Sequence, residues 1–135
     1  MLLIGVGEDM GRIKEKVNQL QIQNSVHFLG QCNNVNELLQ VMDCFIFPSL
    51  YEGLPFTLVE AQAAGLPVYA SDSVSQEAKI TDSVEFISLK KSANYWADRI
   101  LNKIINRVDC KQQIIDNGYS IEDTVKKVSL FYDCV

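Results

Sequence analysis

The stretch CFIFPSLYEGLPFTLVEAQAAGLPVYAS, residues 44–71, decides the fold class of this chain. It opens with an apolar run that Pro48 ends, and it closes with a second apolar run at residues 67–71. Between the two runs, a helical pattern over about residues 57–64 ends at Gly65, and glycine commonly terminates helices. Strand, helix and strand in this order predict a βαβ unit with two parallel strands.

The same alternation extends to both sides of this unit. The predicted strands are residues 2–7, 26–30, 44–49, 67–71 and 84–89. Helical spacing of apolar residues occurs at Met10, Ile13, Val17 and Leu20; at Val35, Leu38, Leu39 and Met42; at Trp96, Ile100 and Ile104; at Cys110, Ile114 and Ile115; and at Ile121, Val125, Val128 and Tyr132. The strands are too apolar to alternate, which indicates burial on both faces of a sheet. We therefore expect a single α/β domain over residues 1–135, a Rossmann-like doubly wound parallel sheet of about five strands with helices on both faces and Trp96 in the core.

Composition and charge exclude several classes of protein. A chain of 135 residues with 47% apolar residues is long and apolar enough for one globular domain. The net charge is −5 and no basic run exceeds two residues, which argues against nucleic-acid binding. The apolar runs are too short for a transmembrane segment, and the start lacks the features of a signal peptide, so we expect a cytoplasmic protein.

Cysteine and histidine are too few and too scattered to predict a zinc site. There are four cysteines, none in a CxxC pair, and one histidine, His27, which is expected to be an ordinary sheet residue. The cysteines are Cys32, Cys44, Cys110 and Cys134. We expect reduced thiols and no metal.

Three loops follow the first three predicted strands and therefore share one edge of the sheet. They are GVGED at residues 5–9, GQCNN at 30–34 and SLYEGLP at 49–55. Ligands of open parallel sheets bind beyond the carboxyl ends of the strands. A ligand site is therefore predicted at this edge.

The junction of loop and helix after residue 53 has the character of an anion site. Backbone N–H groups at residues 54–58 point out of a helix start, and the helix dipole favours an anion such as a diphosphate. Glu60 could accept hydrogen bonds from two ribose hydroxyls, and Glu52 from hydroxyls of a second sugar. Tyr51 and Phe56 would give the pocket apolar walls.

Plainer interpretations of the same residues remain open. Glu60 is equally interpreted as an exposed helix residue, and Glu52 as a loop acid near a helix start. Gly5, Gly7 and Gly11 form a loose GxGxxxG pattern, but the next strand ends in Gly-Gln and not in the acid that a dinucleotide site requires. A turn that shapes a pocket is favoured over a nicotinamide cofactor site, which disfavours a Rossmann-type oxidoreductase.

The stretch FPSLYEGLPFTLVEAQAAGLPVYASD, residues 47–72, resembles the hallmark of family 4 glycosyltransferases, which are retaining enzymes with the two-domain GT-B architecture. The resemblance is close over residues 1–90 and loose over 91–135, and it is to the C-terminal, donor-binding domain. It implies a nucleotide-sugar donor linked to UDP, GDP or ADP, with no metal or other cofactor.

The resemblance also implies roles for individual residues. Glu52 would be the catalytic residue that contacts the donor sugar, and Glu60 would bind the ribose. Backbone N–H groups would face the donor and its diphosphate, except at Pro55, which has none. The residues expected to bind the donor in this way are Gly53, Leu54, Phe56, Thr57 and Leu58. Those expected to border the nucleobase are Gly5, Gly7, Gly30 and Gln31.

Two parts of the family pattern have no counterpart in this sequence. One is the N-terminal, acceptor-binding domain, and the other is a first strand whose arginine and lysine hold the diphosphate. Arg12, Lys14 and Lys16 lie on the next helix and are expected to be solvated. We therefore expect no sugar transfer by the isolated chain, with membrane association, if any, through the missing half. The alternative is a stand-alone, non-catalytic nucleotide-sugar binding module.

The absent first strand would lie between residues 2–6 and 44–47 in a sheet of this kind. Unpaired backbone groups of buried strands cost on the order of 1–3 kcal/mol each. We therefore expect these two strands to close up and pair directly, although a strand from another chain could also fill the slot.

Overall fold

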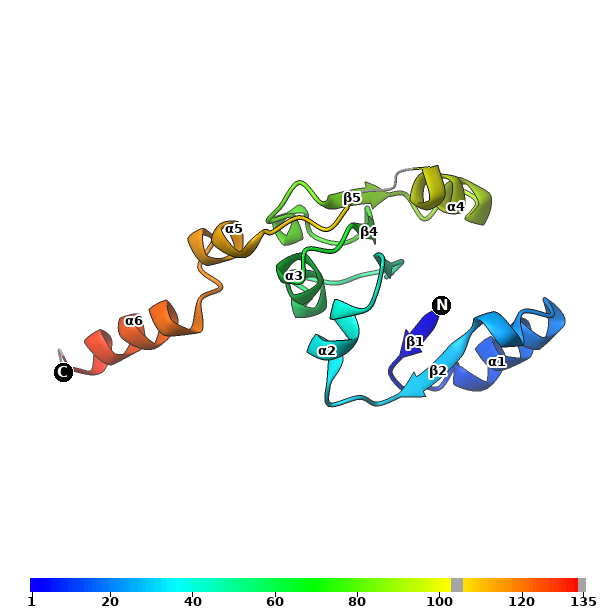
Figure 1. Cartoon of the computed structure of the whole chain (residues 1–135), viewed down its shortest axis with the longest axis horizontal. Helices are drawn as coiled ribbons and strands as arrows, with labels where there is room; N and C mark the ends of the chain where they lie inside the picture. The colour runs from blue at the N-terminus through cyan, green and yellow to red at the C-terminus, as the bar shows by residue number, and fades with distance from the viewer. Residues whose placement is uncertain (103–105, 134–135) are drawn as a thin grey trace. The chain divides into compact units, whose positions relative to one another are not determined.

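The computed structural model describes residues 1–102 and 106–133, in which strands and helices alternate as far as β5 and three helices then follow (Figure 1). The chain divides into two compact units, Met1–Val35 and Asn36–Val135. Each unit contains parallel strands.

The first unit is a βαβ element. Strand β1 (Leu2–Ile4) pairs in parallel with β2 (His27–Gly30), and helix α1 (Met10–Gln19) with the short 3₁₀ turn η1 (Gln23–Ser25) connects them. Val17 is the buried residue of α1, as its apolar spacing predicts.

The second unit contains a three-stranded parallel sheet in the order β3–β4–β5. Its strands are β3 (Phe45–Phe47), β4 (Val68–Ser71) and β5 (Val84–Ile87). All four residues of β4 are buried, because this strand is central and strongly apolar. The core of the unit therefore lies along β4.

The helices of the remaining chain follow in sequence order. They are α2 (Val35–Gln40), α3 (Phe56–Ala63), the 3₁₀ turn η2 (Gln76–Ala78), α4 (Ala93–Asn102), α5 (Lys111–Asp116) and α6 (Ile121–Asp133). Helix α3 packs against β4 and α5. Helix α4 is tied to β5 by an ion pair of 2.6 Å between Arg99 Nε and Glu85 Oε1.

The predicted α/β class with parallel strands is confirmed, and each predicted strand is found within two or three residues of its predicted ends. Trp96 is only half-buried, not in the core, and its indole N–H donates to the carbonyl of Ser88 over 3.2 Å. The predicted positions Ile104 and Cys134 lie outside the described residues.

The prediction that residues 2–6 pair directly with 44–47 stays a prediction, because the two segments belong to different units. Within its own unit, β1 pairs with β2, and β3 pairs with β4. Both strands are short and only partly buried, and Ile46 of β3 is 41% exposed. Backbone groups at such edges can bond to water, which lowers the cost of leaving them unpaired.

Candidate functional site

The predicted donor residues of the second unit lie on the loop that connects β3 to α3. Pro48 follows β3, and the loop then runs beside the segment that follows β4, where Glu52 forms an isolated parallel bridge with Val74. Val74 is 2% exposed and anchors this contact, whereas Glu52, Gly53 and Leu54 are exposed. The bridge therefore holds Glu52 at the carboxyl edge of the sheet with its side chain accessible to solvent.

Helix α3 begins directly after this loop with backbone donors that the helix itself does not use. Pro55 is the N-cap, in extended conformation, and makes no side-chain cap hydrogen bond. Its carbonyl accepts from the N–H of Leu58 over 3.0 Å. The N–H groups of Phe56 and Thr57 precede that bond and have no acceptor within the helix. Together with the helix dipole, they form a place that favours an anion.

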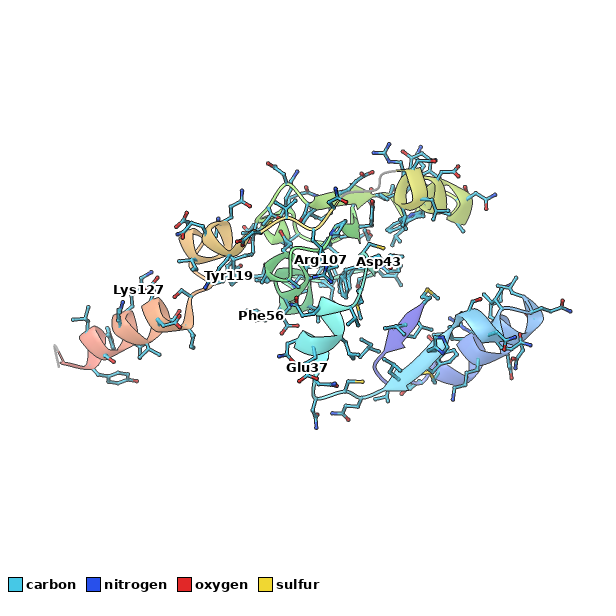
Figure 2. The ribbon with its side chains drawn as sticks, in the orientation of Figure 1. Glu37, Asp43, Phe56, Arg107, Tyr119 and Lys127 are labelled. Atoms are coloured by element: carbon cyan, nitrogen blue, oxygen red, sulfur yellow. The ribbon has the colours of Figure 1, made fainter. Side chains whose placement is uncertain are left out.

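One face of α3 is exposed and the other is part of the core. The exposed face contains Phe56, Thr57 and Glu60, and Figure 2 labels Phe56 on this helix. The buried residues are Leu58, Val59, Ala61 and Gln62. Because Leu58 is fully buried and its N–H is bonded, it can contribute to a ligand site only by supporting its neighbours.

The carboxylates of Glu52 and Glu60 are therefore both exposed, one on the loop and one in the second turn of α3. Carboxylates in such positions accept hydrogen bonds from hydroxyl groups without a large desolvation cost. We expect Glu52, Leu54, Thr57 and Glu60 to line one cleft, and this stays a prediction, because neither the cavity of about 230 Å³ nor that of about 410 Å³ includes them.

The predicted nucleobase residues Gly5, Gly7, Gly30 and Gln31 all belong to the first unit. Gly5 and Gly30 have φ of +122° and +67°, and the N–H of Gly5 donates to the carbonyl of Gly30 over 2.7 Å. Gly5 and Gly7 line an open cavity of about 230 Å³. Its other lining residues are Leu3, Ile4, Val6, Asp9, Met10, Ile13 and Phe28.

This cavity is largely apolar and lies beside the start of α1. Asp9 is the N-cap of α1, makes no side-chain cap hydrogen bond and pairs with Arg12 over 3.5 Å on the surface. Gly5 and Gly7 of the glycine pattern line this pocket, whereas Gly11, Gly30 and Gln31 lie outside its lining, and a nucleobase site there stays a prediction. Arg12 is largely solvated, and the ammonium of Lys14 lies 5.6 Å from the ring centre of Phe28.

A second cavity, of about 410 Å³, lies where α5 meets α6. It is lined by Ile115, Asp116, Gly118, Asp123, Lys126 and Lys127. Lys126 pairs with Asp123 over 3.7 Å, so the charges of this cavity largely balance one another. It has no feature that selects a ligand.

Sequence reasoning missed Gln62, which lies on α3 two residues after Glu60 and is fully buried. The available signal was a long polar side chain within the otherwise apolar AQAAG segment. A buried amide must satisfy its own hydrogen bonds, so its presence there indicated a specific set of partners.

Within the described part of the chain, no group of three or more His, Cys, Asp or Glu side chains could hold a metal ion. None of the described helices combines the length and apolar character needed to cross a membrane.

Comparisons with known proteins agree with the resemblance that the motif carries. The family model described as "Glycosyl transferases group 1" matches residues 1–121. EpsF of Bacillus subtilis (strain 168), whose own assignment as a glycosyltransferase is provisional, is 35% identical over 130 residues, which are 93% of this chain and 34% of EpsF. The UDP-Gal:alpha-D-GlcNAc-diphosphoundecaprenol alpha-1,3-galactosyltransferase of Escherichia coli is 26% identical over 139 residues, 97% of this chain and 36% of that enzyme.

Solved structures show the same fold. The crystal structure of HepE from Anabaena in complex with UDP matches with a TM-score of 0.71 and 17% identity, over 99% of this chain and 40% of HepE. The chain thus spans about a third of the length of these curated relatives, and its parallel α/β architecture is one that a larger protein contains as a part.

Proposed function

The chain belongs to the group 1 glycosyl transferases, a family of the GT-B fold, and from that membership we propose that it supplies the nucleotide-sugar donor site of a retaining transferase of family 4. The observation that supports this most is the junction between the β3–α3 loop and α3. Two backbone donors and a helix dipole lie there between two exposed carboxylates, Glu52 and Glu60. A nucleotide-sugar has the matching order of groups, with a diphosphate between a ribose and a hexose.

Each part of the donor has a partner in this proposal. The N–H groups of Phe56 and Thr57 receive the diphosphate, and the dipole of α3 favours its negative charge. The carboxylate of Glu60 accepts hydrogen bonds from the ribose hydroxyls, and Glu52 accepts from hydroxyls of the sugar that is transferred. Phe56, which is 67% exposed, provides an apolar surface beside the phosphates.

The chemistry that follows is stabilisation of a leaving group. As the bond between the anomeric carbon and the diphosphate oxygen breaks, negative charge grows on the departing nucleoside diphosphate. Preorganised N–H donors and a helix dipole stabilise that charge more than they stabilise the ground state. The acceptor hydroxyl then bonds to the anomeric carbon on the same face and passes its proton to the departing diphosphate oxygen, which retains the configuration. No step of this scheme needs a metal ion.

UDP is the first ligand to test, because HepE was crystallised with UDP and the Escherichia coli relative is named for UDP-Gal. We expect the purified chain to bind UDP more tightly than uridine, by isothermal titration calorimetry, with GDP and ADP as the other candidates and with EDTA having no effect. The Glu60→Gln variant should bind UDP roughly tenfold more weakly, a loss of about 1.4 kcal/mol for hydrogen bonds to a charged group.

Glu15→Gln is the matched control, since Glu15 is an exposed helix residue of α1 outside the proposed site. It should leave UDP affinity unchanged. Equal affinity of the wild-type chain and Glu60→Gln for UDP would remove the role proposed for Glu60.

A further inference from the structure

The apolar residues of α3 do not by themselves determine which face of the helix is buried. Phe56, the largest apolar residue of the helix, is 67% exposed, whereas the polar Gln62 is 0% exposed. Considered for these two residues alone, the hydrophobic effect would bury the phenyl ring and expose the amide. Burial of Leu58, Val59 and Ala61 favours the observed rotation of α3 about its axis, whereas Phe56 and Gln62 oppose it, so a further interaction can decide between rotations.

The side chain of Gln62 provides that interaction, because both ends of its amide are hydrogen-bonded. Its Nε2 donates to the carbonyl of Leu58 over 3.0 Å and to that of Ala78 over 2.8 Å. Its Oε1 accepts from the N–H of Ile80 over 3.0 Å, and from the N–H and the hydroxyl of Thr81 over 2.9 and 3.2 Å.

This network joins α3 to the segment that leads into β5. The hydroxyl of Thr81 lies 2.6 Å from that of Ser83, and the carbonyl of Ser83 accepts from the N–H of Val68 in β4. The amide of Gln62 is therefore connected through two hydroxyls to the central strand of the sheet. If α3 rotated, the carbonyl of Ala78 and the N–H groups of Ile80 and Thr81 would lose a buried partner.

The spacing along the helix links this anchor to the proposed donor site. Residues two apart in an α-helix point about 200° apart around its axis. With Gln62 held toward the sheet, Glu60 must point outward, and Thr57, three residues before Glu60, lies on that same exposed face.

We infer that Gln62 is a positioning residue, which fixes the rotation of α3 and thereby presents Glu60 to the ribose of the donor. This inference rests on the proposed function only for the identity of the ligand. A primary amide is the side chain that suits this site, because it both donates to two carbonyls and accepts from two N–H groups. Methionine fills a similar volume without either ability, and an ionised glutamate can accept but not donate.

The rotation can be measured without any ligand by comparing two cysteine probes on α3. Val59 is 6% exposed and Glu60 is exposed, so Glu60→Cys should react with a maleimide much faster than Val59→Cys. Peptide mapping by mass spectrometry separates these probes from the chain's own cysteines. When each cysteine probe is combined with Gln62→Met, the ratio of the Glu60→Cys rate to the Val59→Cys rate should fall by roughly tenfold. Such a fall corresponds to a change of about 1.4 kcal/mol in the free-energy difference between rotations of α3.

Two further variants separate positioning from a general loss of stability. Gln112→Met makes the same change at an exposed residue of α5 and should leave the ratio of labelling rates unchanged. Gln62→Glu should lower the ratio at pH 8 and recover part of it at pH 5, because the protonated carboxyl again donates one hydrogen bond. A ratio in Gln62→Met equal to that of the wild-type background, measured where both are folded by circular dichroism, would overturn the inference.

UDP binding then tests the link to the donor site through a double-mutant cycle. If Gln62 acts through Glu60, Gln62→Met and Glu60→Gln each weaken UDP binding, and the double variant is little weaker than either. Additive losses would overturn the positioning role while leaving the proposed function intact. No effect of Glu60→Gln would remove the proposed ribose contact, while the labelling ratio would still decide the role of Gln62.

Discussion

Gly65 illustrates how a single residue determines where α3 can end. Its φ is +72°, a region that L side chains rarely adopt, and a Cβ at this position would collide with the carbonyl oxygen of Val108. The N–H of Val108 in turn donates to the carbonyl of Gly65 over 3.2 Å. The helix end and the segment before α5 can therefore approach this closely only where there is no side chain.

The first prediction compares this glycine with one that has space around it. Gly118 also has positive φ, +89°, but nothing lies within 4 Å of a Cβ there. Gly118→Ala should cost about 1 kcal/mol from backbone strain alone, and Gly65→Ala should cost more, about 2–4 kcal/mol. Urea unfolding followed by circular dichroism measures both, and equal losses would show that the contact with Val108 is easily relieved.

The second prediction concerns two weakly acidic side chains near β3 and β4. Burial, followed by the charge of Asp43, raises the pKa of the Cys44 thiol above its ordinary 9.0. Burial, followed by Cys44 and Glu85, likewise raises the pKa of the Tyr69 phenol above 10.0. In each case the folded pKa exceeds the unfolded one, so the contribution to stability is complete below the unfolded pKa and is lost as pH rises.

The urea midpoint should therefore decline as pH rises from 8 to 10.5. The decline of the urea midpoint should be shallower in the Cys44→Ala variant, because of the two groups only Tyr69 then makes stability depend on pH. A midpoint that does not change over this range would contradict both pKa directions.

At the scale of elements, Arg107 connects the ends of two helices. Its guanidinium donates to the carbonyls of Leu39 and Met42, in and just after the last turn of α2, over 2.6 and 2.8 Å. It also donates to the carbonyl of Ala64, the C-cap of α3, over 2.7 Å. Figure 2 shows Arg107 beside α3. Helix C-termini leave carbonyls unsatisfied and carry partial negative charge, and one planar cation satisfies both ends.

The third prediction follows from the shape of this side chain. Arg107→Lys keeps the positive charge but loses the fork that reaches three carbonyls, and it should cost about 1–3 kcal/mol in the free energy of unfolding. Arg12→Lys is the matched control, because Arg12 makes only a surface pair of 3.5 Å with Asp9. That change should cost less than about 0.5 kcal/mol. Similar small losses in the two variants would mean that the bonds of Arg107 contribute little.

At the scale of the whole molecule, the two units differ in the burial of their strands. β1 and β2 form a two-stranded sheet without a fully buried residue. Every residue of β4 is buried, and β4 pairs with a strand on each side, β3 and β5. A βαβ element of this size has little apolar surface to bury, so its opening should cost less free energy than that of the second unit.

The fourth prediction is that native-state hydrogen exchange reflects this difference. Amides of β1 should exchange at least tenfold faster than those of β4, an opening free energy lower by about 1.4 kcal/mol or more. Mass spectrometry of peptides from residues 1–9 and 66–75 would measure it. Equal protection would instead indicate that another strand covers β1 in solution.

The fifth prediction concerns activity. The chain spans 34% of EpsF and 40% of HepE, and in our proposal it binds the donor while the acceptor is bound elsewhere. The purified chain should therefore release no UDP from UDP-glucose above the rate of a blank, even where calorimetry shows that the same sample binds UDP. Sugar transfer to an added acceptor by this chain alone would contradict that division of roles.

The sequence by itself determined the α/β class, the order of strands and helices, and the loop and helix in which Glu52 and Glu60 lie. Proline, glycine and apolar periodicity carry this information, because they act over a few residues and depend little on the rest of the fold. The strands near residues 44–49 and 67–71 and the helix between them were located in this way, to within two residues at each end.

Only the tertiary structure decided which strands pair and which side of α3 faces the sheet. The partner that each strand takes within its unit depends on how much of the strand is buried, which no local pattern records. The burial of Gln62 and the exposure of Phe56 were equally hidden, because hydrogen-bond partners 16 to 19 residues away along the chain override the local hydrophobic preference. Local sequence thus places Glu60 on a helix, and the long-range hydrogen bonds of Gln62 direct the side chain of Glu60 outward.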